Sequence, residues 1–197
     1  MEKHLFDIKR AIDDSIVTKQ FILNDKLFLS SIDSAISICV DALRKGGKIW
    51  FAGNGGSAAD AQHLAAELSG RFYLDRKSLP AEALNVNSSF MTAVANDYGY
   101  DKVYARLLQG CARQGDVLVA ISTSGNSKNI LEAVKTAKSM YVKVIGLTGK
   151  TGGALADHCD VLLNVPSTDT PRIQEAHITV GHIICELVEQ IIFGEKH

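Results

Sequence analysis

The sequence has 197 residues, of which 46% are hydrophobic, 21 are lysine or arginine and 22 are aspartate or glutamate. A chain of this length fits one domain and buries roughly 70% of the surface that its unfolded form exposes. The formal net charge of -1 and the scattering of the basic residues exclude the positive surface typical of nucleic-acid-binding proteins, so we expect no nucleic-acid partner.

The N-terminal residues, the length of the apolar runs and the cysteine spacing bear on where the protein is located. The first ten residues mix charges from the second position, which differs from the order of a signal peptide. No apolar run approaches the length of a membrane span, so we expect no membrane association. The cysteines lack the paired spacing of a zinc or redox motif; they are Cys39, Cys111, Cys159 and Cys185. We therefore expect reduced, mostly buried thiols in a cytoplasmic protein.

Two amphipathic helices are predicted to lead the chain, over residues 3–23 and 27–45, because apolar residues recur there at helical spacing. Gly46 and Gly47 end the second helix. Short apolar runs then alternate with helical patterns. The predicted strands cover residues 48–52, 81–86, 116–121, 142–147 and 161–165.

These runs predict an α/β fold. Continuous Val, Ile and Leu are typical of strands buried on both faces, and alternation with helices implies right-handed crossovers. We expect a three-layer sandwich around a doubly wound, five-stranded parallel sheet, closed by a long helix over Arg172–Phe193 that Pro171 starts. The chain, 1–197, is interpreted as one domain with a helical pair (1–46) and an α/β core that includes the C-terminal helix (47–197).

A glycine-rich loop, Gly53–Ser57, leads directly into a predicted helix that carries His63 and Glu67. Side chains four residues apart share one helix face, and these two could move protons or hold a metal. The loop by itself also fits an ordinary tight turn, because it has neither the lysine of a Walker loop nor the spacing of a dinucleotide fingerprint.

A second polar loop, Ser122–Ser127, offers four hydroxyl groups and a glycine between a buried strand and a helix. Hydrogen bonds to a charged group contribute roughly 1.5 to 3 kcal/mol each, so such donors could hold a phosphate without lysine or arginine. The alternative is a Ser/Thr-rich turn with a helix cap. If the first and third strands are neighbours, this loop and Gly53–Ser57 meet at the edge where doubly wound sheets bind ligands.

Two further segments hold candidate residues. In the last helix, Gln174 and His182 lie on one ridge, whereas His177 lies well round the helix and is interpreted as a structural residue. Asn96 and Asp97 follow a short predicted helix. They fit either a capping turn or a pair of side chains that accept hydrogen bonds from sugar hydroxyl groups.

With these residues in view, the chain resembles the sugar isomerase (SIS) domain family, and most closely the phosphoheptose isomerases that act on sedoheptulose 7-phosphate. The similarity runs over nearly the whole sequence. It is strongest in five blocks, which are Gly53–Glu67, Asn96–Gly99, Gly115–Ser127, Leu147–Gly153 and Arg172–His182.

The resemblance implies a doubly wound sheet with flavodoxin-like strand order, a homotetramer and active sites near subunit interfaces. It implies that the sugar is contacted by Asn54, Gly55, Gly56, Asn96 and Asp97, with Gln174 also at the substrate. It implies that the phosphate is held by Ser57, Ser122, Thr123, Ser124 and Ser127.

The resemblance also implies an acid/base pair, Glu67 and His182, that isomerises the ketose to D-glycero-D-manno-heptose 7-phosphate through an enediol. Some members bind zinc, and the matching ligands are His63, Glu67, Gln174 and His182. Because a carboxylate bound to zinc is a poorer base, the two roles of Glu67 compete, and we rank the acid/base role first.

Other readings stay open at this point. A non-catalytic SIS tetramer that binds a replication initiator protein shares the fold and loops but lacks counterparts of Glu67 and His182. A sugar-phosphate sensor needs the phosphate loop alone, usually beside a DNA-binding domain. Another aldose-ketose isomerase of the family, acting on arabinose or hexulose phosphate, often carries other motifs or appended domains.

Overall fold

The computed structural model describes residues 4–194 and contains a five-stranded parallel sheet with the order β2-β1-β3-β4-β5. The strands are β1 (Ile49–Ala52), β2 (Ala81–Ala83), β3 (Val117–Ile121), β4 (Lys143–Thr148) and β5 (Val161–Asn164). Strand β1 pairs with both β2 and β3, so the strand order reverses there and the loops after β1 and β3 adjoin. The predicted α/β fold and its strand order are confirmed.

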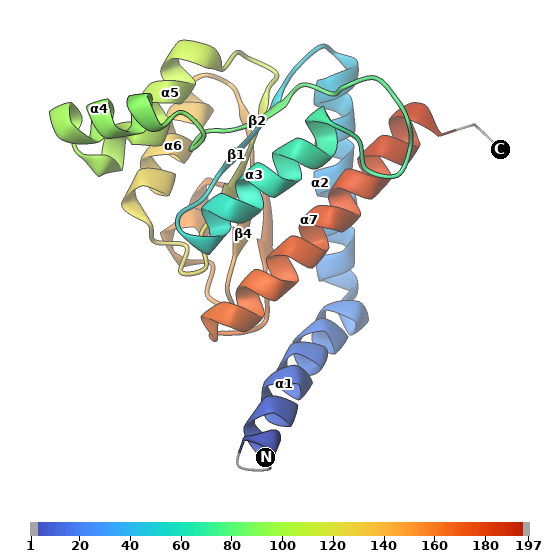
Figure 1. Cartoon of the computed structure of the whole chain (residues 1–197). Coiled ribbons are helices and arrows are strands. Elements are labelled where there is room, and N and C mark those ends of the chain that lie inside the picture. The colour runs from blue at the N-terminus through green and yellow to red at the C-terminus, as the bar shows by residue number, and fades with distance from the viewer. Residues whose placement is uncertain (1–3, 195–197) are drawn as a thin grey trace.

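Helices cover both faces of the sheet and make the predicted three layers (Figure 1). Helices α2 (Lys26–Arg44), α3 (Gly56–Ser69) and α7 (Thr170–Phe193) cover one face, whereas α4 (Ser88–Tyr98), α5 (Val103–Cys111) and α6 (Lys128–Ser139) cover the other. Alternate residues of β1 divide between the two cores: Ile49 and Phe51 face the first, Trp50 and Ala52 the second. Two 3₁₀ turns, η1 (Tyr100–Lys102) and η2 (Gly153–His158), complete the chain.

Strand β2 is shorter than the predicted run of residues 81–86. Leu84 N–H still donates to the carbonyl of Phe51, at 2.9 Å, but Val86 is 51% exposed. The next residue, Asn87, caps α4 by accepting from Phe90 N–H at 3.0 Å. The start of a helix therefore ends the strand early, although Leu84 and Val86 are apolar.

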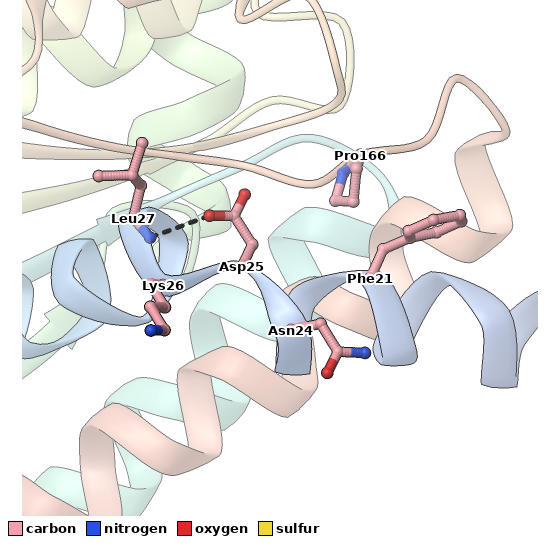
Figure 2. A pocket seen from close by; sticks show the side chains of 6 residues that line it. All are labelled: Phe21, Asn24, Asp25, Lys26, Leu27 and Pro166. Atoms are coloured by element: carbon pink, nitrogen blue, oxygen red, sulfur yellow. Dashed lines mark hydrogen bonds between the residues drawn. The ribbon is translucent and has the colours of Figure 1, made fainter.

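The N-terminal helical pair is present, with α1 spanning Leu5–Asn24; residue 3 of the predicted helix lies outside the described residues. Asp25 separates the two helices and accepts a hydrogen bond from Leu27 N–H at the start of α2 (Figure 2). It also accepts one from Phe28 N–H. Helix α1 buries only Thr18 and Ile22 and projects from the α/β body (Figure 1).

Helix α7 is long and apolar enough to cross a membrane by length and composition, although the sequence led us to expect no such segment. It packs against α2 and α3, and residues from Ile173 to Val188 enter the core. Two of its polar side chains, His177 and Glu189, are also buried. Its apolar character is that of a central core helix.

Candidate active site

Three side chains from two helices, α3 and α7, converge in one cluster. His63 Nε2 lies 3.1 Å from Glu67 Oε1 and 3.2 Å from His182 Nε2, and the two imidazole rings meet edge to face at 4.9 Å. His63 and Glu67 share one face of α3 because they are one helical turn apart. His182 comes from α7, so the fold completes the cluster with a residue 119 positions away.

The cluster has an unusual donor arrangement. His63 Nε2 faces two partners, and one nitrogen can either donate a proton or accept one, so a single proton cannot satisfy all three atoms. The three ligand atoms lie within 4.8 Å of one another, and imidazole nitrogens with a carboxylate oxygen are ligands that zinc prefers. The site can therefore move protons, and its donor set also fits a divalent cation.

Gln174 lies beside the glycine loop at the start of α3. A Cβ atom added at Gly56 would lie 2.8 Å from Gln174 Nε2, so the amide packs directly over this backbone. Gln174 precedes His182 by eight residues, about two turns of α7. The predicted ridge of this helix thus runs from the loop to the cluster, and Gly56 leaves room for it.

His177, in contrast, takes no part in the cluster. It is buried on the side of α7 that faces the sheet, where its Nε2–H donates to the carbonyl of Thr148 at 3.0 Å. The prediction that this histidine is structural is confirmed.

The loop Gly53–Ser57 is tied to α6 through an amide pair. Asn54 and Asn129 exchange two hydrogen bonds of 2.8 Å, and Tyr100 Oη donates to Asn54 Oδ1 at 3.3 Å. Tyr104 Oη donates to the carbonyl of Gly53 at 2.6 Å. The sequence analysis missed Asn129 and both tyrosines, because nothing local to them indicates a loop 46 to 75 residues away.

The serine-rich loop after β3 adjoins this loop, because β1 and β3 are parallel neighbours and both loops follow their carboxyl ends. Ser122 Oγ and Ser127 Oγ lie 3.0 Å apart, and Ser124 Oγ accepts from Asn126 N–H at 3.1 Å. Gly125 has a φ of 66°, and a Cβ there would overlap the carbonyl of Gly152, so only glycine fits this turn. Backbone geometry therefore holds the hydroxyl groups together.

A pocket of about 290 Å³ opens beside this loop. Its lining includes Thr123, Ser124, Lys150 and Ser167. Lys150 is an exposed cation that the sequence analysis did not single out, and it follows β4 at the same edge of the sheet. Hydroxyl donors with one nearby cation suit an anionic group. Ser57, which is buried, belongs to the neighbouring loop at the start of α3.

In the part of the chain that the structure describes, Asn96 and Asp97 hydrogen-bond to each other and not to the groups above. Both are exposed near the end of α4, and Asn96 Nδ2 donates to Asp97 Oδ1 at 2.9 Å. Within residues 4–194, neither side chain makes a hydrogen bond to the loops after β1 or β3. The turn that follows them nevertheless brings Tyr100 onto Asn54.

Asp60 is a further residue that the sequence analysis missed. It precedes His63 by one turn on α3, and burial raises the pKa of its carboxyl group, while His63 and His182 partly offset the rise. Its Oδ2 is buried and has no hydrogen-bond partner among the described residues. The i, i+3 spacing to His63 was the signal that could have found it.

Comparisons with known proteins agree with this arrangement. The SIS domain family matches residues 25–149 and again residues 107–192. The phosphoheptose isomerase of Clostridium acetobutylicum is 50% identical over 189 residues, which are 96% of each chain. Solved phosphoheptose isomerases from Francisella tularensis and Neisseria gonorrhoeae superpose with TM-scores of 0.92 and 0.89, at 37% and 43% identity. The two superpositions cover 95% and 94% of this chain, and 99% and 98% of the respective solved chains. The chain therefore belongs to the SIS domain family and groups there with the phosphoheptose isomerases.

Proposed function

We propose that this chain is an aldose-ketose isomerase that converts D-sedoheptulose 7-phosphate to D-glycero-D-manno-heptose 7-phosphate. The observation that carries the proposal is the meeting of Glu67 with His63 and His182, in a chain that also holds a hydroxyl-rich loop after β3 and is 50% identical to a phosphoheptose isomerase. The reaction would supply the first step of nucleotide-activated heptose synthesis, for lipopolysaccharide or other surface glycans.

The chemistry requires one base and a proton donor. The Glu67 carboxylate removes a proton from C1 of the open-chain ketose, while a proton reaches the C2 oxygen and an enediol forms. Glu67 returns its proton to C2, the O1 proton leaves, and C1 becomes the aldehyde. His182 donates the proton to the C2 oxygen and accepts the proton that leaves O1. The support for a shared role is that Glu67 and His182 both approach the same histidine, His63.

Binding divides between the two loops. In our proposal Ser57, Ser122, Thr123, Ser124 and Ser127 hold the phosphate, and Lys150 adds a positive charge at the pocket rim. Asn54, Gly55 and Gly56 contact the sugar, with Gln174 over Gly56. Asn96 and Asp97 are the remaining sugar contacts; their exposure leaves them free to meet a ligand or a second subunit.

We also propose one zinc ion per subunit, held by His63, Glu67, Gln174 and His182. The support is the donor set, in which two imidazole nitrogens and a carboxylate oxygen converge within 4.8 Å of one another. Zinc would supply Lewis-acid polarisation of the substrate oxygens. When Glu67 binds the ion it is a weaker base, so the two roles belong to different stages or different states of the site.

The proposed assembly is a homotetramer of single SIS domains, each spanning 1–197, in the cytoplasm and without a nucleic-acid or membrane partner. Helix α1 supports it through exposed apolar side chains that a lone subunit would leave in water: Phe6, Ile8, Ile12, Ile16 and Phe21. Beside them a pocket of about 560 Å³ is bordered by Phe21, Leu27 and Pro166 (Figure 2).

The decisive experiment incubates the purified protein with sedoheptulose 7-phosphate and follows the aldose product by NMR. Glu67→Gln should lower kcat at least 100-fold while leaving the fold intact, because the amide cannot take up the C1 proton. Glu132→Gln, in an exposed ion pair on α6, is the matched control and should keep wild-type activity.

Chelation followed by addition of Zn²⁺ forms a second arm, in which activity should fall and then return. Activity that is indifferent to both treatments would contradict the zinc proposal alone. If no aldose heptose phosphate forms under any condition, the enzymatic proposal is wrong, and the non-catalytic reading, in which the tetramer binds a replication initiator or another protein, takes its place.

A further inference from the structure

A buried ion pair joins the segment after α3 to helix α7, behind the cluster of His63, Glu67 and His182. Arg76 Nε lies 2.8 Å from Glu189 Oε1, and the two side chains are 3% and 0% exposed. A buried ion pair is weak evidence for stabilisation, since replacing such a pair by apolar residues of similar volume often leaves the stability unchanged or higher. The hydrogen bonds that this pair makes indicate what it orients.

Glu189 holds the segment that follows α3. Its carboxylate accepts from the backbone N–H groups of Phe72, Tyr73 and Leu74 at 2.7 to 2.9 Å. The ring of Phe72 lies 5.7 Å from the ring of His182, which precedes Glu189 by about two turns on the same helix. One carboxylate on α7 therefore sets Phe72 against the imidazole of α7.

Arg76 holds the end of α3. Its guanidinium donates to the carbonyls of Glu67, Leu68 and Gly70 at 2.7 to 3.0 Å. The last carbonyls of a helix have no partner within the helix, so these bonds fix its final turn. That turn carries Glu67. Figure 1 shows the segment between α3 and β2 passing across the C-terminal half of α7.

We infer that Arg76 and Glu189 are positioning residues, which touch no substrate and hold the last turn of α3 against α7 so that Glu67 and His182 meet at one reacting centre. The inference rests on the proposed function for its catalytic consequence. Its geometric content, the orientation of His182 relative to Glu67, is independent of that function. Displacement of a reacting group by about 1 Å can lower a rate 100-fold.

Two variants test the inference. Arg76→Lys keeps both buried charges, but its single nitrogen cannot reproduce the guanidinium's simultaneous bonds to Glu189 and to three helix-end carbonyls. Glu189→Gln keeps the shape and removes the charge. Val134→Ala is the matched control: this buried residue lies on α6 in the other core, so it lowers stability without contacting either site helix. If Glu189→Gln fails to fold, Arg76→Lys carries the test.

We expect kcat to fall at least 10-fold in Arg76→Lys while KM changes less than threefold, because the serine loop that would hold the phosphate lies between β3 and α6 and, among the described residues, makes no hydrogen bond to Arg76 or Glu189. In ¹H–¹³C spectra of labelled histidine, the signals of His63 and His182 should shift. His177, on the same helix but bonded to Thr148, should not. Val134→Ala should change neither kcat nor any of these signals.

Wild-type kcat together with unmoved His63 and His182 signals in Arg76→Lys would overturn the inference. So would an equal response of His177, because it would mean a general loosening of α7. If wild-type protein lacks isomerase activity, the proposed function fails, and the histidine signals still decide whether the pair positions the cluster.

Discussion

At the scale of single residues, His177 shows how a buried histidine couples folding to pH. Its Nε2–H donates to the Thr148 carbonyl, and its Nδ1 is buried with no partner among the described residues. Burial lowers the pKa of His177 from 6.5 to about 4, although the bond to Thr148 works in the opposite direction. The imidazole is therefore neutral in the folded protein, and it must stay neutral for the native packing to persist.

This shift predicts a loss of stability in mild acid. Because the unfolded chain takes up the proton first, the free energy of unfolding should be fully retained above pH 6.5 and should fall as the pH drops toward 4, by about 3 kcal/mol in total. Urea unfolding at a series of pH values would measure this. His177→Gln should be less stable at neutral pH and should show a shallower slope between pH 6.5 and 4; an unchanged slope would contradict the assignment.

At the scale of elements, the approach of α3 to α7 decides whether the site exists. A Cβ atom added at Gly181 would lie 2.5 Å from Leu64 Cδ1, so the two helices are in direct contact there. Gly181 directly precedes His182, and Leu64 directly follows His63. The missing side chain at Gly181 therefore permits the 3.2 Å separation of the two imidazoles.

Gly181→Ala should force the helices apart. We expect it to cost about 1 to 3 kcal/mol of stability through overpacking, offset in part by the better helix propensity of alanine, and to lower kcat at least 10-fold. Adding Leu64→Ala should make room and restore part of the activity, although the pair of changes leaves the core less well filled. Turnover and urea unfolding of the single and double variants would measure both effects. Undiminished kcat in Gly181→Ala would mean that helix separation does not govern the site.

At the scale of the whole molecule, helix α1 exposes large apolar side chains to solvent. Phe6 is 75% exposed and Phe21 is 60% exposed, on a helix that projects from the body (Figure 1). Burying such side chains against another subunit contributes roughly 1.5 to 3 kcal/mol each. This surface supports the proposed self-association through α1.

Replacing Phe6 and Ile12 with aspartate should therefore weaken assembly by roughly tenfold to 100-fold per residue. Sedimentation or light scattering at several protein concentrations would show a shift from tetramer toward smaller species. Ser34→Asp, an equal change of charge at an exposed position of α2, should leave the tetramer intact. A wild-type protein that stays monomeric at all concentrations would contradict the proposed assembly.

The sequence by itself determined the features that depend on neighbours along the chain. Five apolar runs predicted five strands, and the i, i+4 spacing placed His63 and Glu67 on one face, because helix geometry alone sets that relation. The meeting of His182 with His63 was expected from the family resemblance and not from the local pattern, whereas only the tertiary structure decided that Asn129 holds Asn54 and that Arg76 joins Glu189. These pairs lie 75 to 119 residues apart, and their meeting depends on how helices pack over a common sheet, which periodicity along the chain does not encode.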